Sequence, residues 1–223
     1  MSAERWATLD CYGTLVDWNE GIRVELGRLL GPGRKEELLA RYHEVEPQVQ
    51  EADPEAPYRE VMARVLERLA AEAGAELPAD ERDALGRSLP GWPVFEEVPA
   101  ALREAHQRGW KLVALSNSDR DLIEASLEAI GVPFDGAVVA GDIGSYKPAH
   151  AHWEEFFASY PVDRERHVHV AQSHFHDIVP ANQLSIPSVW INRLGERHEP
   201  ASTREQSDLR GLADTLDELV PSI

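Results

Sequence analysis

The residues best suited to chemistry are a few polar side chains, each of which follows a short apolar segment. Asp10 ends the segment Trp6-Ala7-Thr8-Leu9 and precedes a glycine turn, so its carboxylate is a candidate nucleophile. The later segments are followed by Ser116, Asn117, Lys147 and Asp177. A lone loop aspartate or lysine is ordinarily a solvated surface residue. Because these side chains recur at the ends of successive predicted strands, we expect them to form one shared site.

The elements that would bring these side chains together are predicted after residue 93, where helices and strands alternate. Strands are expected over 6–10, 110–115, 136–140, 167–171 and 188–191. Helices are expected over 98–108, 119–130, 149–159, 177–184 and 206–219. Alternation of this kind predicts a Rossmann-like, doubly wound α/β fold, in which helices cover both faces of a parallel sheet. Ligands bind such sheets at the carboxyl ends of the strands, where the polar side chains lie.

The segment between the first strand and residue 93 has a helical pattern. Helices are expected over 34–45, from Pro57 onward, and over 79–89. We therefore expect a helical cap domain over residues 16–92, inserted into a Rossmann-like catalytic core of residues 1–15 and 93–223. A cap in this position could close over the ligand-binding edge of the sheet.

Net charge and cysteine content limit the partners and the compartment of the protein. The chain of 223 residues carries a formal charge of -18 at pH 7. Nucleic acids and anionic membranes bind basic surfaces, so this charge argues against both as partners. A small anionic substrate would need local cations inside the site. No apolar run approaches the roughly 20 residues that span a bilayer, residues 1–5 lack the layout of a signal peptide, and Cys11 is the single cysteine. We therefore expect a cytoplasmic protein without an internal disulfide.

The motifs resemble those of the haloacid dehalogenase superfamily over nearly the whole chain. The segment Asp10-Cys11-Tyr12-Gly13-Thr14-Leu15 is similar to its nucleophile motif, Leu115-Ser116-Asn117 to its second motif, Tyr146-Lys147-Pro148 to its third, and the segment that ends at Asp177 to its fourth. The predicted helical insertion is similar to the cap domain of that superfamily. The resemblance implies a hydrolase with Asp10 as its nucleophile.

Two positions narrow the resemblance to the L-2-haloacid dehalogenase (type II) branch. Tyr12 stands where phosphatases of the superfamily carry a second aspartate that protonates the leaving group, and a halide needs no such proton. Gln172 stands where they carry an acidic ligand of Mg²⁺, and a neutral amide binds this cation more weakly. The resemblance therefore implies no metal and no other cofactor. Asp10, the Tyr12 carbonyl and Asp177 remain as a weak alternative set of metal ligands.

In the mechanism that the resemblance implies, Asp10 displaces a halide from C2 of a short 2-haloacid with inversion at C2, and water hydrolyses the resulting ester. Lys147 would keep Asp10 ionised, because a nearby cation favours the carboxylate. Asp177 would orient or deprotonate the water, and His174 or His176 could share that work. The substrate would contact Tyr12, Thr14, Arg41, Ser116, Asn117, Trp153 and His174.

Arg41 and Trp153 carry the most specific of these expectations. Arg41 lies on the predicted second cap helix, at the spacing from Asp10 where the dehalogenases place a halide-binding arginine. Trp153 stands where they usually carry a tyrosine, six residues after the motif lysine. We expect Trp153 to narrow the pocket and to favour haloacetates, including fluoroacetate.

Other functions remain open from the sequence alone. A Mg²⁺-dependent phosphatase, or another hydrolase of the same superfamily, would keep the fold and the nucleophile. A binding or regulatory protein could keep the fold without turnover, although it would have little reason to retain Asp10, Lys147 and Asp177 together. Histidines that could suggest a zinc site are His150, His152, His167, His169, His174 and His176. His167 and His169 are expected on one strand face and His174 and His176 in the loop beyond it, so we expect no zinc. The resemblance also allows a homodimer.

Overall fold

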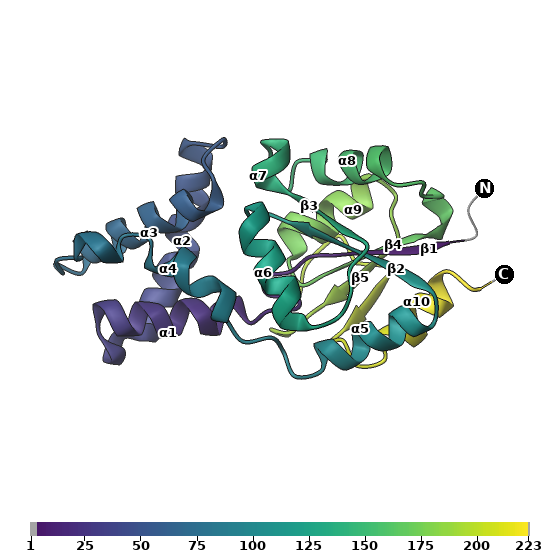
Figure 1. Ribbon diagram of the computed structural model, residues 1–223, viewed down its shortest axis with the longest axis horizontal. Coiled ribbons are helices and arrows are strands. Elements are labelled where there is room, and N and C mark those ends of the chain that lie inside the picture. Colours follow the sequence, from purple (N-terminus) through teal and green to yellow (C-terminus); the bar gives the residue numbers. More distant parts are fainter. Residues whose placement is uncertain (1–3, 223) are drawn as a thin grey trace.

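The computed structural model describes residues 4–222, which form an α/β unit and a separate group of helices (Figure 1). Within those residues, six parallel strands make one sheet in the order β3-β2-β1-β4-β5-β6. The strands are β1 (Arg5–Leu9), β2 (Trp110–Ser116), β3 (Gly136–Val139), β4 (His167–Ala171), β5 (Ser188–Ile191) and β6 (Arg204–Gln206). The Rossmann-like α/β fold predicted from the alternation is confirmed, with β1 between β2 and β4.

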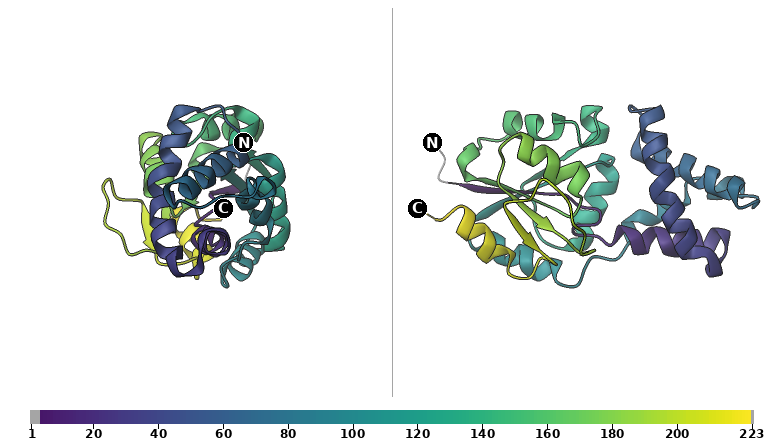
Figure 2. Two further views of the ribbon diagram at one scale, coloured as in Figure 1. Left: turned by 90° about the vertical axis from the view of Figure 1, so that its left-hand side faces the viewer. Right: turned by 180° about the vertical axis from the view of Figure 1, so that it is seen from behind.

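Helices cover both faces of the sheet (Figures 1 and 2). They are α5 (Val98–Gln107), α6 (Arg120–Ile130), α7 (Ala140–Ile143), α8 (Ala151–Ser159), α9 (Val179–Gln183) and α10 (Leu212–Leu219). Apolar residues of α5, α6 and α10 pack with Ala7 and Leu9 of β1. On the other face, α8 and α9 pack with Trp6, because successive strand residues point to opposite faces. None of the helices found within residues 4–222 has the length and apolar composition needed to cross a membrane.

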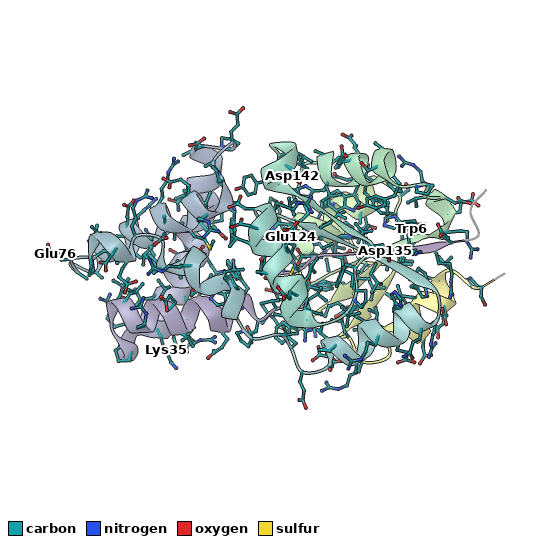
Figure 3. All side chains as sticks on the ribbon, in the orientation of Figure 1. Trp6, Lys35, Glu76, Glu124, Asp135 and Asp142 are labelled. Atoms are coloured by element: carbon teal, nitrogen blue, oxygen red, sulfur yellow. The ribbon has the colours of Figure 1, made fainter. Side chains whose placement is uncertain are left out.

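The second group of helices lies at one end of the molecule, where Lys35 and Glu76 are labelled in Figure 3. It contains α1 (Trp18–Leu30), α2 (Lys35–Ala52), α3 (Tyr58–Glu72) and α4 (Ala84–Ser88), with 3-10 turns at Pro32–Arg34, Ala79–Glu81 and Leu89–Gly91. The Asp17 carboxylate begins α1 by accepting the Glu20 N–H at 3.0 Å. We propose that this group is the cap domain, with the boundaries 16–92 expected from the sequence.

The helical group is anchored to the α/β unit beside the carboxyl ends of the strands. Asp119, which precedes α6, accepts the first N–H groups of α3, from Tyr58 at 3.0 Å and from Arg59 at 2.9 Å. A carboxylate in this position satisfies free helix donors and complements the helix dipole. The Tyr146 hydroxyl donates to the Ala56 carbonyl at 2.7 Å, next to the motif residue Lys147. The site and the helices above it are therefore mechanically connected.

Several element boundaries differ from the expectations. The helix expected over 206–219 begins only at Leu212, after Gly211 in the left-handed region (φ 73°), and β6 precedes it. β6 consists of Arg-Glu-Gln and has no apolar pattern, because it is an exposed edge strand that depends on pairing with β5. The helix expected over 34–45 continues through Pro47 to Ala52. The helix expected over 79–89 is divided into a 3-10 turn at Ala79–Glu81 and the short helix α4.

Candidate active site

A cavity of about 990 Å³ separates the carboxyl ends of the strands from the helical group. Asp10, Ser116 and Gln172, which follow or end β1, β2 and β4, line its floor, and Trp18, Glu46 and Tyr58 line its cap side. The direction of strand order changes between β1 and β4, and a crevice opens at such a switch point. The cavity is thus where the topology places a ligand.

Asp10 is held in position by the turn that follows β1. Its N–H donates to the Val170 carbonyl of β4 at 3.0 Å. The Thr14 hydroxyl donates to Oδ2 of Asp10 at 2.6 Å and accepts the Gln172 N–H at 2.9 Å. Gly13 allows the chain to turn so that Thr14 reaches Asp10, because a φ of 89° is strained for residues with a Cβ atom. Thr14 is fully buried and does not line the cavity, so it positions Asp10 and is not the substrate contact that we expected.

Lys147 joins the two carboxylates of the site. Its Nζ donates to Oδ1 of Asp10 at 2.8 Å, to Oδ1 of Asp177 at 2.7 Å and to the Leu115 carbonyl at 2.9 Å. All three ammonium protons therefore have acceptors. The Asn117 amide accepts the Lys147 N–H at 2.6 Å and donates to the Lys147 carbonyl at 2.9 Å, which fixes the lysine main chain. The structure thus brings together Asp10, Lys147 and Asp177 from distant parts of the sequence.

For both Asp10 and Asp177, burial raises the pKa of the carboxylate and the Lys147 charge lowers it. Burial raises the pKa of Asp10, and Lys147 and Thr14 oppose this effect. At Asp177, Lys147 and His169 together outweigh burial and hold the pKa well below its usual range. Burial lowers the pKa of Lys147, but the two carboxylates outweigh it and raise the pKa above its ordinary value. Lys147 is therefore a cation at neutral pH, and it favours the ionised Asp10 that a nucleophile requires.

Ser116 and Asn117 line the cavity at the end of β2. The Ser116 hydroxyl oxygen is buried and has no hydrogen-bond partner among the described residues. The Ser116 carbonyl accepts Nε2–H of His152 at 3.0 Å, and burial lowers the pKa of His152 to about 4. A buried hydroxyl without a partner costs free energy. The arrangement therefore suits an anionic group of a ligand at Ser116 and Asn117.

Tyr12 lines the cavity with its ring, but its hydroxyl pairs with the Ser126 hydroxyl of α6 at 3.1 Å. Burial raises the pKa of Tyr12 well above its ordinary value. Tyr12 can therefore serve as a wall of the site, but its phenol is a poor acid for a leaving group.

Besides Thr14, two further expected substrate contacts, Arg41 and Trp153, lie outside the cavity. Arg41 donates to the Glu72 carboxylate of α3 at 2.7 and 2.8 Å and to Glu44 at 2.6 Å. These carboxylates hold the guanidinium, and Arg41 is not among the described residues that line the cavity, where we expected it to contact a halide. Trp153 is fully buried between α8 and the sheet, with its ring 5.2 Å from that of His169. The expectation that Trp153 narrows the pocket is wrong, because burial against the sheet directs this large ring into the core.

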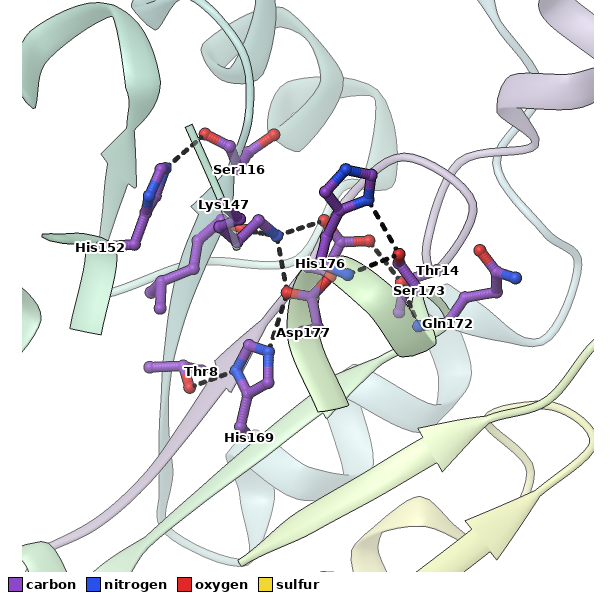
Figure 4. Close-up of polar contacts among 12 residues, drawn as sticks. Thr8, Thr14, Ser116, Lys147, His152, His169, Gln172, Ser173, His176 and Asp177 are labelled. Atoms are coloured by element: carbon purple, nitrogen blue, oxygen red, sulfur yellow. Dashed lines mark hydrogen bonds and ion pairs between the residues drawn. The ribbon is translucent and has the colours of Figure 1, made fainter. Parts of the chain in front are cut away.

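A π-helical turn, His174–Ile178, follows β4 and places two histidines in the cavity wall. Nε2–H of His174 donates to the Pro200 carbonyl at 2.9 Å, and its ring stacks on His198 at 4.9 Å. Nδ1 of His176 lies 3.0 Å from the Ser173 hydroxyl, which also accepts the His176 N–H (Figure 4). Burial lowers the pKa of His176, so this ring is neutral at neutral pH. The ring of His174 is committed to the loop, whereas His176 faces the site.

Asp10, Asp177 and Gln172 are the side chains of the site that could contact a metal ion. Within residues 4–222, no three His, Cys, Asp or Glu side chains converge as a metal site. Asp10 and Asp177 share the Lys147 ammonium, and Gln172 adds only a neutral amide. A metal ion bound by both carboxylates would lie close to this ammonium and be repelled by it. The Lys147 ammonium thus supplies a positive charge between the two carboxylates.

Arg193 and Glu46 are among the cavity-lining residues that sequence reasoning missed. Arg193 follows β5, donates to the Thr14 carbonyl at 2.8 Å and to Glu97 at 2.7 Å, and could have been found by its strand-end position. Glu46 of α2 accepts the Tyr58 hydroxyl at 2.9 Å, and burial raises its pKa to about 7. No signal in the sequence separates Glu46 from the many exposed glutamates around it.

The parallel sheet, the helical insertion after its first strand and the site at the strand ends define a Rossmann-like α/β protein with an inserted group of helices. The family of haloacid dehalogenase-like hydrolases matches residues 5–178. The protein belongs to this family, and the superfamily resemblance seen in its motifs is confirmed.

Individual relatives agree with this assignment. The (S)-2-haloacid dehalogenase of Pseudomonas sp. (strain YL) is 28% identical over 198 residues, which cover 85% of this chain and 83% of that protein. The phosphoserine phosphatase of Thermus thermophilus is 28% identical over 151 residues, which cover 66% of this chain and 59% of that protein. The crystal structure of the L-2-haloacid dehalogenase RSc1362 superimposes with a TM-score of 0.85 at 22% identity, over 97% of this chain and 100% of that one. The last comparison shows a shared fold.

Proposed function

We propose that this protein hydrolyses the carbon–halogen bond of short 2-haloacids, with Asp10 as the nucleophile and inversion at C2. Its relatives include an (S)-2-haloacid dehalogenase, which supports this substrate class. The surroundings of Asp10 carry the proposal. Lys147 holds the carboxylate, and Tyr12, with its hydroxyl on Ser126, stands where a phosphatase needs an acid. A leaving group that departs as a stable anion fits such a site.

In the first step, an Asp10 carboxylate oxygen attacks C2 from the side opposite the halogen. The carbon–oxygen bond forms as the carbon–halogen bond breaks, and the halide leaves with the electron pair. Ser116 and Asn117 would hold the substrate carboxylate, because they line the cavity at the end of β2. Lys147 and Thr14 keep the nucleophile in one orientation, which lowers the entropic cost of reaching the attack geometry.

In the second step, water attacks Cγ of the Asp10 ester. The bond between Cγ and the ester oxygen breaks, and that oxygen leaves as the hydroxyl of a 2-hydroxy acid, which takes up a proton from the water. The water oxygen stays in Asp10, and one proton is released. As water adds to Cγ, Lys147 stabilises the negative charge that develops on the Asp10 oxygen that it contacts.

Halide release from fluoroacetate, chloroacetate and 2-chlorobutyrate, with and without EDTA, tests the proposal. We expect release that EDTA does not change and that Asp10→Asn abolishes. One turnover in ¹⁸O-labelled water should place the label in the Asp10 peptide. Halide release that survives Asp10→Asn would contradict the proposal. Because the cavity of about 990 Å³ is much larger than a haloacetate, we also expect 2-chlorobutyrate to be accepted.

Phosphatase activity is the second candidate, since a phosphoserine phosphatase is among the relatives. The absence of an acid at Tyr12, whose hydroxyl pairs with Ser126, and the neutral Gln172 in place of an acidic ligand of Mg²⁺ weigh against it. Magnesium-stimulated phosphate release from phosphoserine, without halide release from the acids, would replace the first proposal by the second. If neither halide nor phosphate is released, a binding protein is favoured.

A further inference from the structure

A row of hydrogen-bonded side chains leads from Asp177 into the sheet (Figure 4). Nε2 of His169 lies 3.0 Å from Oδ1 of Asp177, and Nδ1 of His169 lies 2.8 Å from the Thr8 hydroxyl. The same hydroxyl lies 2.7 Å from Nε2 of His167. Asp177, His169, Thr8 and His167 are all completely buried. β1 pairs with β4 so that Thr8 stands opposite His169, and the two-residue strand period places His167 on the same face.

The pattern of donors along this row fixes the tautomer of His169. Asp177 is ionised, so its Oδ1 can only accept, and Nε2 of His169 must carry a proton. The other ring nitrogen then accepts the Thr8 hydroxyl proton, and the Thr8 oxygen accepts Nε2–H of His167. Of the four ring nitrogens of the two histidines, Nδ1 of His167, an acceptor in this tautomer, is the one without a partner among the described residues. A second proton on His169 would reverse the row and leave a buried N–H of His167 unpaired, which costs free energy.

The two carboxylate oxygens of Asp177 differ in their hydrogen bonds. Oδ1 receives Lys147 and His169, whereas Oδ2 is buried and has no partner among the described residues. Two donors on one oxygen restrict rotation of the carboxylate. Oδ2 therefore keeps one direction, and Asp177 is one of the residues that line the cavity that also contains Asp10.

We propose that His169 is a positioning residue for the second step of the reaction. It holds Asp177 so that Oδ2 can accept a hydrogen bond from the water that attacks the Asp10 ester. This role rests on the proposed function, because it requires an ester on Asp10. The role concerns ester hydrolysis and not ester formation, since His169 does not contact Asp10. Trp153 supports it by packing its ring at 72° to the His169 ring.

Paired substitutions of His169 test this role. In His169→Gln, the amide nitrogen can occupy the place of Nε2 and donate to Asp177. In His169→Asn, the shorter side chain leaves a polar atom near Thr8 but no donor near Asp177. Rapid-quench turnover with chloroacetate separates the steps, because halide release reports ester formation and the mass of the Asp10 peptide reports the ester. We expect His169→Asn to slow ester hydrolysis by about 10- to 100-fold, with ester formation nearly unchanged, and His169→Gln to restore most of the rate.

The outcomes distinguish this role from the function on which it rests. A wild-type protein that releases no halide and carries no ester would overturn both proposals. If the wild type forms the ester and His169→Asn hydrolyses its own ester at the wild-type rate, the role of His169 alone is overturned. Equal slowing of both steps in both variants would also overturn it, since it would indicate general damage. If His169→Asn does not fold, Thr8→Val replaces it, with Thr8→Ser as its control. We expect a longer ester lifetime only in Thr8→Val.

Discussion

The Nζ atom of Lys147 lies 2.8 Å from Oδ1 of Asp10, and these residues are only 2% and 6% exposed. Two charges buried this deeply are stable only when they form an ion pair, because an isolated buried charge has lost its hydration. The pair therefore serves chemistry and stability together. Removing the lysine would leave Asp10 and Asp177 facing each other without a cation.

Lys147→Met tests this link, because methionine keeps much of the length of lysine without its charge. We expect halide release to fall by at least about 100-fold and the free energy of unfolding to fall by about 3 kcal/mol. Urea unfolding measures the second effect. Lys111→Met is the matched control, since Lys111 pairs with Asp135 at 2.8 Å on the surface. This control should lose less than about 1 kcal/mol, and an equal loss in both variants would contradict the prediction.

Thr14→Val should show that the Thr14 hydroxyl positions the nucleophile. Valine keeps the shape of threonine but removes the donor to Asp10 and the acceptor for the Gln172 N–H. We expect a loss of about 1–3 kcal/mol in stability and a fall in the turnover number with little change in KM. Thr14→Ser retains the hydroxyl and should stay close to the wild type. Steady-state kinetics of both variants decide the matter, and a similar defect in Thr14→Ser would point to packing instead.

Arg41→Ala distinguishes the cap geometry seen here from the halide contact that the resemblance implies. Because Arg41 pairs with Glu72 and Glu44 outside the cavity, we expect kcat/KM to change by less than about 2-fold and stability by less than about 1 kcal/mol. Arg193→Ala should be much more damaging, since it frees the Thr14 carbonyl and leaves Glu97 without its cation. A large loss of kcat/KM in Arg41→Ala, with a raised KM, would show that the cap moves Arg41 into the site.

Glu46 should make stability depend on pH. Burial raises its pKa from 4.5 to about 7, so the folded state holds the proton more tightly than the unfolded state. The resulting stabilisation is complete below pH 4.5 and is lost as the pH rises through about 7. Glu46→Gln cannot titrate, so its free energy of unfolding should improve relative to the wild type between pH 5 and pH 8. Thermal unfolding at both pH values measures this, with Glu44→Gln on the same helix as the control. A constant difference between wild type and Glu46→Gln would refute the prediction.

The alternation of apolar segments and helical patterns was enough to predict the sheet, because buried parallel strands need continuous apolar runs. All residues of β1 and β4 are buried, and their bounds lie close to those expected. β6 escaped prediction, since Arg204–Gln206 is stabilised by pairing with β5 and not by an apolar pattern. The grouping of Asp10, Lys147 and Asp177 was predictable for the same topological reason, as parallel strands end at one edge of the sheet.

The directions of side chains were not predictable in this way. Arg41 points to Glu72 on a neighbouring helix, and Trp153 turns into the core under β4. His169 meets Thr8, its partner 161 residues away, only because β1 and β4 pair in one register. The sequence by itself thus determined which strand ends carry the reactive groups, through periodicity and strand order. Only the tertiary structure decided which side chains face the cavity, because that choice depends on packing and hydrogen-bond partners that are distant along the chain.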